Sequence, residues 1–405
     1  MRKVRVVVVL VVMVLVAAAC GSSSKKGASA GGSTTASSAG KATGSTINVG
    51  VIGSLTGPQA SSSDQFGTVA PAWADYVNQQ LGGINGHPVK VFVQDDGNDP
   101  AKAQAAEKTL VDSDNVVAIV VGSDNLVTAF DGDAIGKGVA VISGTANSTD
   151  WYSKAGMYPT VTDVLSGLSG QLLVAKQFAK ATKFADLYCA EIAACQQADP
   201  PLKAAATKAG VGFTSLAVSS TAPSYTAQCV QLQQQKVDYA QLNFASAAAA
   251  KFMQDCQAQG YNPTWGSSAQ AIGKDLLGVS NVTVYGPAYA FPSVASAAPA
   301  QTFVSAMTKY AKDSNWREGT ASFTWSGLEV LRKALANAGA TPTRQDVTSG
   351  LNSFNGEDLG GLLANKLTFS AGKTIPFGGH PCMFVIGIKN GKTIAPANLT
   401  PSCVS

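Results

Sequence analysis

The chain has 405 residues, of which 45% are hydrophobic and 13% charged, and its formal net charge is +4. Six basic residues and no acidic residue precede Ile47, so residues 47–405 carry 23 basic and 25 acidic side chains, a net charge of −2. This balance excludes the basic surface of a nucleic-acid-binding protein. A segment of this length is too long for a domain with one hydrophobic core, and it is long enough for two such domains.

The N-terminus has the pattern of an export signal. Arg2, Lys3 and Arg5 precede fourteen apolar residues that end in three alanines before Cys20. This apolar run is shorter than the roughly 20 residues of a transmembrane helix, so residues 1–19 are predicted to be a removable signal peptide. The cysteine after three alanines resembles the lipobox of bacterial lipoproteins, which implies that Cys20 is lipidated. Soluble secretion with an unpaired Cys20 is the alternative.

Residues 20–46 consist almost entirely of Ser, Gly, Ala, Thr and Lys and are predicted to be a flexible tether. After the tether, short β-branched runs alternate with helical patterns. Continuous apolar strands separated by helices predict a parallel sheet that is covered on both faces. The predicted strands of this first series are 47–53, 88–96, 116–122 and 139–144, and the helices between them are 64–81, 100–113 and 125–136.

The same alternation restarts after a Gly- and Ser-rich stretch at 160–170, which predicts a second lobe. A mostly helical region follows at 299–363, and the segment from Lys366 reads as strands with a hairpin turn at Asn390-Gly391. The predicted strands of the second series are 184–190, 212–220, 238–244, 264–268 and 282–291, and its helices are 172–182, 196–209, 224–235 and 247–259.

Four motifs resemble the Leu/Ile/Val-binding protein family: INVGVIGSLTGPQA, LGGINGHPVKVFVQDDGNDPAKA, LVDSDNVVAIVVG and VAVISGTANS, in that order. The resemblance implies the type I periplasmic binding fold, an α/β fold with two Rossmann-like lobes and a hinge of three crossing strands. The crossings are expected near 160–163, 285–290 and 363–366. Lobe 1 is then 47–161 plus 290–363, and lobe 2 is 162–289 plus 364–405.

The same resemblance implies the function and the partners. Members of the family are extracytoplasmic substrate-binding lipoproteins of ABC importers, which capture a small solute and deliver it to permease subunits in the membrane. For this chain we therefore expect a small-molecule solute, an ABC permease, a membrane anchor through Cys20 and a monomeric state. A ligand-sensing lobe for a membrane receptor uses the same fold and stays open as an alternative.

Ligands of open α/β sheets lie beyond the carboxyl ends of the strands, where loops and helix N-termini present free N–H groups. An aromatic near residues 323–325 lines the cleft in the family. For each polar residue the alternative is a turn or cap, and for Phe323 and Trp325 it is the core. The predicted ligand-binding residues are Ser54, Ser123, Asp124, Asn125, Thr145, Ala146, Asn147, Glu191, Asn243, Phe244, Ser267, Ser268, Phe323 and Trp325.

The solute is expected to differ from a branched-chain amino acid. In the family a glutamate of the second lobe holds the ammonium group, and the matching stretch TWGSSAQAIG places Ser268 there. Asp124 or Glu191 could supply the charge from other loops, although either could equally be a solvated rim residue. We therefore expect a small polar or amide-like solute, with an amino acid as the second choice.

Six cysteines remain besides Cys20, and none forms a C-x-x-C motif, which favours disulfides over a redox or metal site. Chain order suggests the pairs Cys189–Cys195, Cys229–Cys256 and Cys382–Cys403. The two histidines, His87 and His380, are not adjacent to a serine motif, and neither G-x-S-x-G nor a phosphate-binding glycine loop occurs. We expect no catalytic residue, cofactor or metal, and a secreted hydrolase is the disfavoured alternative.

Overall fold

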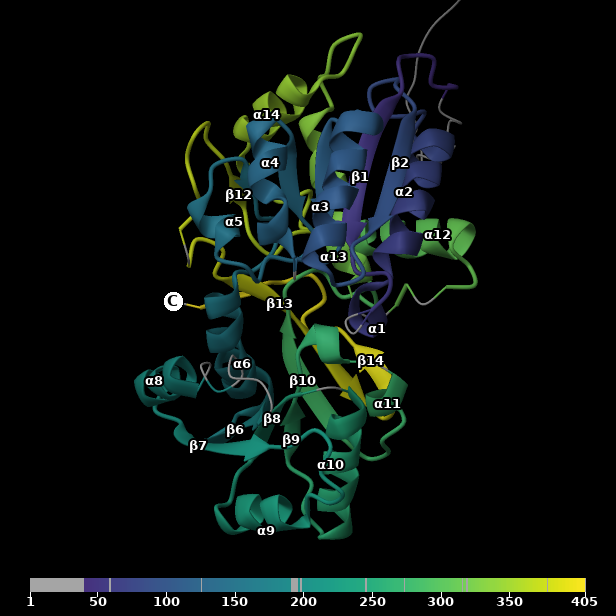
Figure 1. Ribbon diagram of the computed structural model, residues 1–405. Coiled ribbons are helices and arrows are strands. Elements are labelled where there is room, and N and C mark those ends of the chain that lie inside the picture. Colours follow the sequence, from purple (N-terminus) through teal and green to yellow (C-terminus); the bar gives the residue numbers. More distant parts are fainter. Residues whose placement is uncertain are drawn as a thin grey trace, which may run out of the picture. The chain divides into compact units, whose positions relative to one another are not determined.

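The computed structural model describes residues 40–57, 60–124, 126–190, 196, 199–244, 246–272, 274–314, 316–317, 320–376 and 378–404 (Figure 1). The predicted signal peptide and Cys20 lie outside these ranges, as do Asn125, Glu191 and Cys195, so the predictions on them stay predictions. Within the described ranges, no helix has both the length and the apolarity that a membrane span requires.

Five parallel strands form the first sheet, in the order β2-β1-β3-β4-β5. They are β1 (Ile47–Gly53), β2 (Val89–Asp95), β3 (Ala118–Val121), β4 (Ala140–Ser143) and β5 (Met157–Tyr158). The four predicted strands are present, because each is an apolar run that can be buried on both faces. The two-residue β5 was not predicted, since so short a pairing leaves no periodic signal.

Helices cover both faces of the first sheet (Figure 1). They are α1 (Ala60–Ser63), α2 (Phe66–Gln80), α3 (Pro100–Lys108), η1 (Thr109–Ser113), η2 (Val127–Ala129), α4 (Asp131–Gly136), α5 (Asp150–Ser153), α12 (Ala298–Tyr310), α13 (Ala321–Ala334) and α14 (Arg344–Asn352). Trp73 of α2 and Trp325 of α13 share one buried cluster with Val49. Leu110 and Phe130 belong to the cluster that contains Ile119. The sheet is therefore the middle of three layers.

The second sheet has the order β14-β13-β10-β9-β8-β6-β7, with β15 paired to β13. Its parallel strands are β6 (Lys183–Cys189), β7 (Gly212–Val218), β8 (Tyr239–Asn243), β9 (Thr264–Gly266) and β10 (Thr283–Ala288), and its antiparallel strands are β13 (Cys382–Lys389), β14 (Lys392–Ile394) and β15 (Ser402–Cys403). Asn390 and Gly391 both have positive φ between β13 and β14, which is the hairpin turn that this dipeptide predicts.

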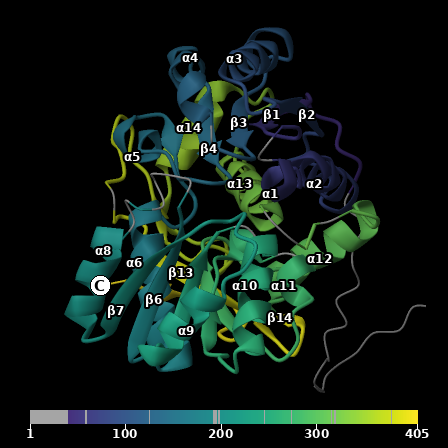
Figure 2. The same ribbon diagram turned by 60° about the horizontal axis from the view of Figure 1, so that its bottom comes forward.

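The helices of the second sheet lie on its two faces. They are α6 (Val164–Ala179), α8 (Asp199–Ala209), α9 (Thr226–Gln234), α10 (Ser246–Ala258), η3 (Ala269–Ala271) and α11 (Lys274–Leu277). Leu172 of α6 packs in one cluster with Phe184, whereas Phe252 of α10 packs in another cluster with Leu187. Figure 2 shows α9, α10 and α11 gathered on one side of this sheet.

The first and last crossings between the sheets are hydrogen-bonded to each other. The Thr162 hydroxyl donates to the Cys382 carbonyl at 2.6 Å, and His380 Nδ1 lies 3.1 Å from the Val161 carbonyl. Asp163 also accepts from the backbone N–H of Gly378 at 3.2 Å. These hydrogen bonds link the two crossings into one strap between the sheets.

The segment around the predicted crossing at 363–366 packs with the first sheet. Strand β11 (Asn355–Glu357) pairs with β12 (Leu367–Thr368). Leu367 and Phe369 are buried in the cluster that contains Trp73, and the Phe369 ring lies 5.1 Å from that of Tyr158. These apolar side chains pack the segment against the first core, and the boundary between the lobes stays a prediction.

Two disulfides join described residues in the pairs that chain order suggested. Cys229 of α9 is bonded to Cys256 of α10, and Cys382 of β13 to Cys403 of β15. Cys189 is also disulfide-bonded, and its pairing with Cys195 stays a prediction. The first bond joins neighbouring helices, and the second holds the C-terminal strand against the sheet.

Candidate functional site

Three of the predicted loops meet at the carboxyl ends of β1, β3 and β4. The Ser54 N–H donates to the Ser123 hydroxyl at 3.2 Å, and the Asp124 N–H donates to the Thr145 hydroxyl at 3.1 Å. Ser54, Ser123 and Thr145 are all buried, and so is Ala146. These hydroxyls therefore orient neighbouring loops, which is the turn-and-cap alternative that the sequence left open.

Asp124 is the centre of this loop cluster. Its Oδ1 accepts from the Thr145 hydroxyl and the Asn147 amide, both at 3.0 Å. Its Oδ2 accepts from the backbone N–H of Asn147, from that of Ser148 at 3.0 Å and from the Trp151 indole at 3.2 Å. The side chain is 4% exposed. These five donors all belong to the lobe of Asp124, so the carboxylate fixes the loop after β4. It is therefore poorly placed to pair with the ammonium group of a solute.

The loop after β1 is held by two aspartates at the end of β2. The Ser54 hydroxyl donates to Asp96 at 2.6 Å. Asp95 accepts from the N–H of Leu55 and from the hydroxyl of Thr56. Burial disfavours the Asp95 anion, but donors on Thr56 and Gly97 outweigh it and hold the pKa of this carboxyl below its usual value. Asp95 and Asp96 therefore hold the loop after β1 in place.

Gly144 lets the loop after β4 approach β3. Its N–H donates to the Val121 carbonyl at 2.8 Å, and a Cβ at this position would lie 2.2 Å from that carbonyl oxygen. Gly144→Ala must therefore push the loop away from β3, and we expect it to lower the free energy of unfolding by about 1–3 kcal/mol in urea titrations.

Gly132 offers the matched control for this prediction. It lies in α4, and no atom lies within 4 Å of the position that a Cβ would take. Gly132→Ala is expected to be neutral or to stabilise by about 0.5–1 kcal/mol, because alanine loses less backbone entropy in a helix. Equal effects of the two substitutions would contradict the close approach at Gly144.

In the second sheet, Asn243 belongs to a buried polar network. Its amide donates to Asp186 at 2.7 Å and exchanges hydrogen bonds with Gln171 of α6, and Gln241 donates to it at 3.2 Å. Burial, opposed by the Asn243 hydrogen bond and aided by the charge of Asp199, raises the pKa of Asp186 to about 7. The predicted residue Asn243 is therefore tied to its own lobe.

The other predicted residues divide between core and surface. Phe244 is buried with its ring 6.0 Å from that of Phe252, and Trp325 is buried 5.3 Å from Phe303, so both belong to the core. Ser267 is fully buried, and Ser268 is half-buried where η3 begins. Trp325 therefore packs in the core, and its predicted part in ligand binding stays a prediction.

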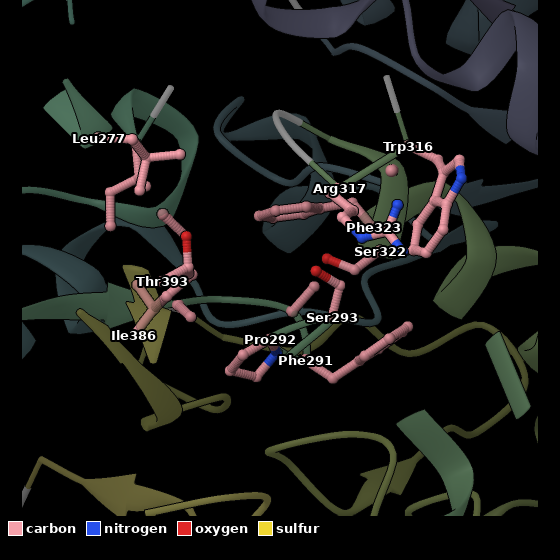
Figure 3. Close-up of a pocket in the computed structure, with 15 residues that line it drawn as sticks. Leu277, Phe291, Pro292, Ser293, Trp316, Arg317, Ser322, Phe323, Ile386 and Thr393 are labelled. Carbon is pink, nitrogen blue, oxygen red and sulfur yellow. The ribbon is translucent and has the colours of Figure 1, made fainter. Parts of the chain in front are cut away.

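A pocket lies near Phe323, the one predicted residue that lines it (Figure 3). Its walls come from η3, from α11, from the end of β10 and the segment after it, from the connection before α13 and the start of α13, and from β13 and β14. Figure 3 shows Leu277, Ile386 and Thr393 on one side and Trp316, Arg317 and Phe323 on the other. The lining residues are Ala269, Ile272, Leu277, Ala288, Ala290, Phe291, Pro292, Ser293, Trp316, Arg317, Ala321, Ser322, Phe323, Ile386 and Thr393.

The sequence interpretation missed Trp316 and Arg317. Arg317 is exposed, and its guanidinium carbon lies 3.8 Å from the centre of the Trp316 ring, whereas the Trp316 ring is buried against Phe303 at 5.5 Å. The WR dipeptide follows no strand and matches no motif. Only the packing of α12 and α13 brings it beside the segment after β10.

The two histidines bond to backbone carbonyl groups. Burial lowers the pKa of His380, whose Nδ1 lies 3.1 Å from the Val161 carbonyl. His87 Nδ1 lies 2.8 Å from the Ser45 carbonyl. Across the described ranges, no three His, Cys, Asp or Glu side chains gather as metal ligands. The histidines therefore serve the fold.

Comparison with known proteins finds one matching family and a relative that is similar over a short segment. A family model described as periplasmic binding protein matches residues 46–392. An "Amino acid binding protein" of Pseudomonas aeruginosa is 39% identical over 72 residues, which span 18% of this chain and only 19% of that protein.

Solved structures share the fold at low sequence identity. The branched-chain amino acid transporter substrate-binding protein LivJ of Streptococcus pneumoniae, in complex with isoleucine, superimposes with a TM-score of 0.66 at 17% identity, covering 89% of this chain and 99% of that one. A fatty acid ABC transporter substrate-binding protein of Thermomonospora curvata gives 0.64 at 20% identity, covering 89% and 94%. Proteins of one fold thus carry chemically different solutes.

Proposed function

The chain belongs to the periplasmic binding protein family, and from this premise we propose that it is the lipid-anchored solute-binding component of an ABC importer. Members of the family act outside the cytoplasm and bind solutes, so the protein is not an enzyme and the hydrolase alternative is excluded. In the proposal, Cys20 carries the lipid, the monomer captures a small polar solute between its lobes, and permease subunits receive it.

The observation that carries this proposal is the pocket at Phe323. Residues that line it come from the second sheet, such as Ile386 of β13, and from α13, which packs on the first sheet. A solute contacts the residues of the second sheet and those of α13 at the same time only when these two groups of residues lie close together. Binding would therefore favour one hinge state over another. The strap at Thr162 and Cys382 gives that movement a defined path.

We expect a bound solute to stabilise the protein and to make it more compact. At a concentration of about 100 times its Kd, a ligand that binds only the folded state contributes about 2.7 kcal/mol. A thermal-shift screen of amino acids, amides, polyols and small carboxylates identifies the solute, and X-ray scattering then measures the radius of gyration. A scattering profile that stays unchanged at saturation would contradict the clamp. Stabilisation by leucine, isoleucine or valine would favour the amino-acid alternative.

A further inference from the structure

The pocket at Phe323 has one charged group in an otherwise apolar lining. Of its fifteen lining residues, Arg317 is the only charged side chain, and Ser293, Ser322 and Thr393 are the only hydroxyls. The remaining walls are alanine, isoleucine, leucine, proline and aromatic side chains. A lone cation above apolar walls is complementary to a small molecule that has an anionic end and an apolar body.

The Arg317 guanidinium is available to such an anion. Its face stacks on the Trp316 ring at 3.8 Å, and stacking leaves the N–H donors at the edge of the guanidinium free for a bidentate bond to a carboxylate. No carboxylate forms an ion pair with Arg317 in the part of the chain that the structure describes. Trp316 thereby stacks on a cation that forms no ion pair with any carboxylate of the described residues.

The N-terminal end of α13 adds a second electrostatic contribution that favours an anion in the pocket. Ala321, Ser322 and Phe323 form the first turn of this 14-residue helix and also line the pocket. The N-terminal end of a helix carries a partial positive charge that favours an anion. Thr320 at the N-cap makes no side-chain cap hydrogen bond. Arg317 and the helix end therefore favour the same sign of charge.

The same lining disfavours a zwitterion. An ammonium group that leaves water needs a carboxylate partner to offset its lost hydration, and none of the described residues that line the pocket is an aspartate or glutamate. Asp124, one of the two carboxylates that the sequence offered for this role, already accepts five hydrogen bonds in its own lobe, and the other, Glu191, lies outside the described residues. The pocket has a volume of about 40 Å³, which accommodates about three water-sized groups and suits a compact head group.

We propose that the solute is a small monocarboxylate with a compact apolar body, whose carboxylate pairs with Arg317. The inference rests on the proposed function, since it names the solute class for the same protein. It differs from the amide-like solute that the sequence favoured, because the sequence did not reveal that Arg317 lines the pocket.

The test compares carboxylates with their uncharged amides in calorimetric titrations of the full mature chain. Butanoate and benzoate are the anionic probes, and butanamide and benzamide match them in shape. We expect the wild-type chain to bind each acid at least about tenfold more tightly than its amide, as the loss of a charge-assisted hydrogen bond implies. Arg317→Met should weaken acid binding by about tenfold and leave amide binding unchanged.

Lys312→Met is the matched control, because Lys312 is an exposed cation on the same connection and does not line the pocket. It should leave acid binding within about twofold of wild type, as expected for a distant screened charge. Arg317→Lys keeps the charge but loses the planar fork, so its affinity should lie between those of wild type and Arg317→Met. It also serves as the test if Arg317→Met does not fold.

Equal affinity for acid and amide, or acid binding that survives in Arg317→Met, would refute the inference. So would an absence of binding by either acid. In all these cases leucine or an amide that closes the lobes in X-ray scattering would leave the proposed function standing. Failure of every solute in the screen to change the scattering would count against the proposed function itself.

Discussion

Replacing Asp186 with asparagine is expected to raise the free energy of unfolding at pH 8 by about 2–4 kcal/mol. Asp186 is fully buried in β6, and its Oδ2 has no hydrogen-bond partner within the described residues. Burial raises the pKa of this carboxyl to about 7, with a further contribution from the charge of Asp199. The ionised side chain therefore weakens the fold at neutral pH, and an asparagine keeps the bond from Asn243 without the charge.

The sign of the pH dependence follows from this raised pKa. Below about pH 4 the Asp186 carboxyl is neutral in the folded and unfolded states and has no effect. Between about pH 4 and pH 7 the unfolded chain loses the proton while the folded chain keeps it, so stability falls as the pH rises. Urea titrations from pH 4 to pH 8 should show that Asp186→Asn reduces this slope. The exposed Asp75→Asn is the control, and an equal slope in Asp186→Asn and wild type would contradict the prediction.

Asp124→Asn should have the opposite effect and lower the free energy of unfolding by about 2–4 kcal/mol. The carboxylate accepts from two backbone N–H groups, the Asn147 amide, the Trp151 indole and the Thr145 hydroxyl. An amide would turn one accepting atom into a donor that faces other donors, leaving them unpaired in a buried site. Differential scanning calorimetry of the ligand-free protein measures the loss.

The control for Asp124→Asn is again Asp75→Asn, because Asp75 is exposed and accepts a single bond from Gln79. Surface changes of this kind alter stability by less than about 0.5 kcal/mol. If Asp124→Asn melted like wild type but lost affinity for an ammonium-bearing solute, the carboxylate would be a ligand group after all. That result would support the sequence interpretation over the structural one.

The strands and caps of the fold could be predicted because their causes are local. An apolar run such as AIVV of β3 indicates a strand whose sheet is covered on both faces. Asp99 before Pro100 caps α3 by accepting from the N–H groups of Ala101 and Lys102. The Asn390-Gly391 turn likewise needs only two residues with positive φ. These features depend on neighbours in sequence.

The site was harder to predict because its contacts are tertiary. The carboxyl ends of strands did identify Ser54, Ser123 and Thr145 as neighbours, but they did not reveal that the Asp124 carboxylate accepts from Thr145 and from three residues of the segment after β4. Phe323 and Trp325 are two residues apart in α13 and therefore face different directions, so one lines the pocket while the other is buried beside Phe303. Periodicity alone could not say which was which.

The first core is assembled from two distant pieces of chain. Trp73 of α2 and Trp325 of α13 belong to one buried cluster, although they lie 252 positions apart in the sequence. An exported chain that emerges with its N-terminus first exposes the apolar face of β1 and α2 until α13 arrives. The entropy of closing so long a loop slows that contact, and an exposed apolar sheet invites aggregation meanwhile. We therefore expect refolding of the protein to be slow and prone to aggregation until α13 packs on this face.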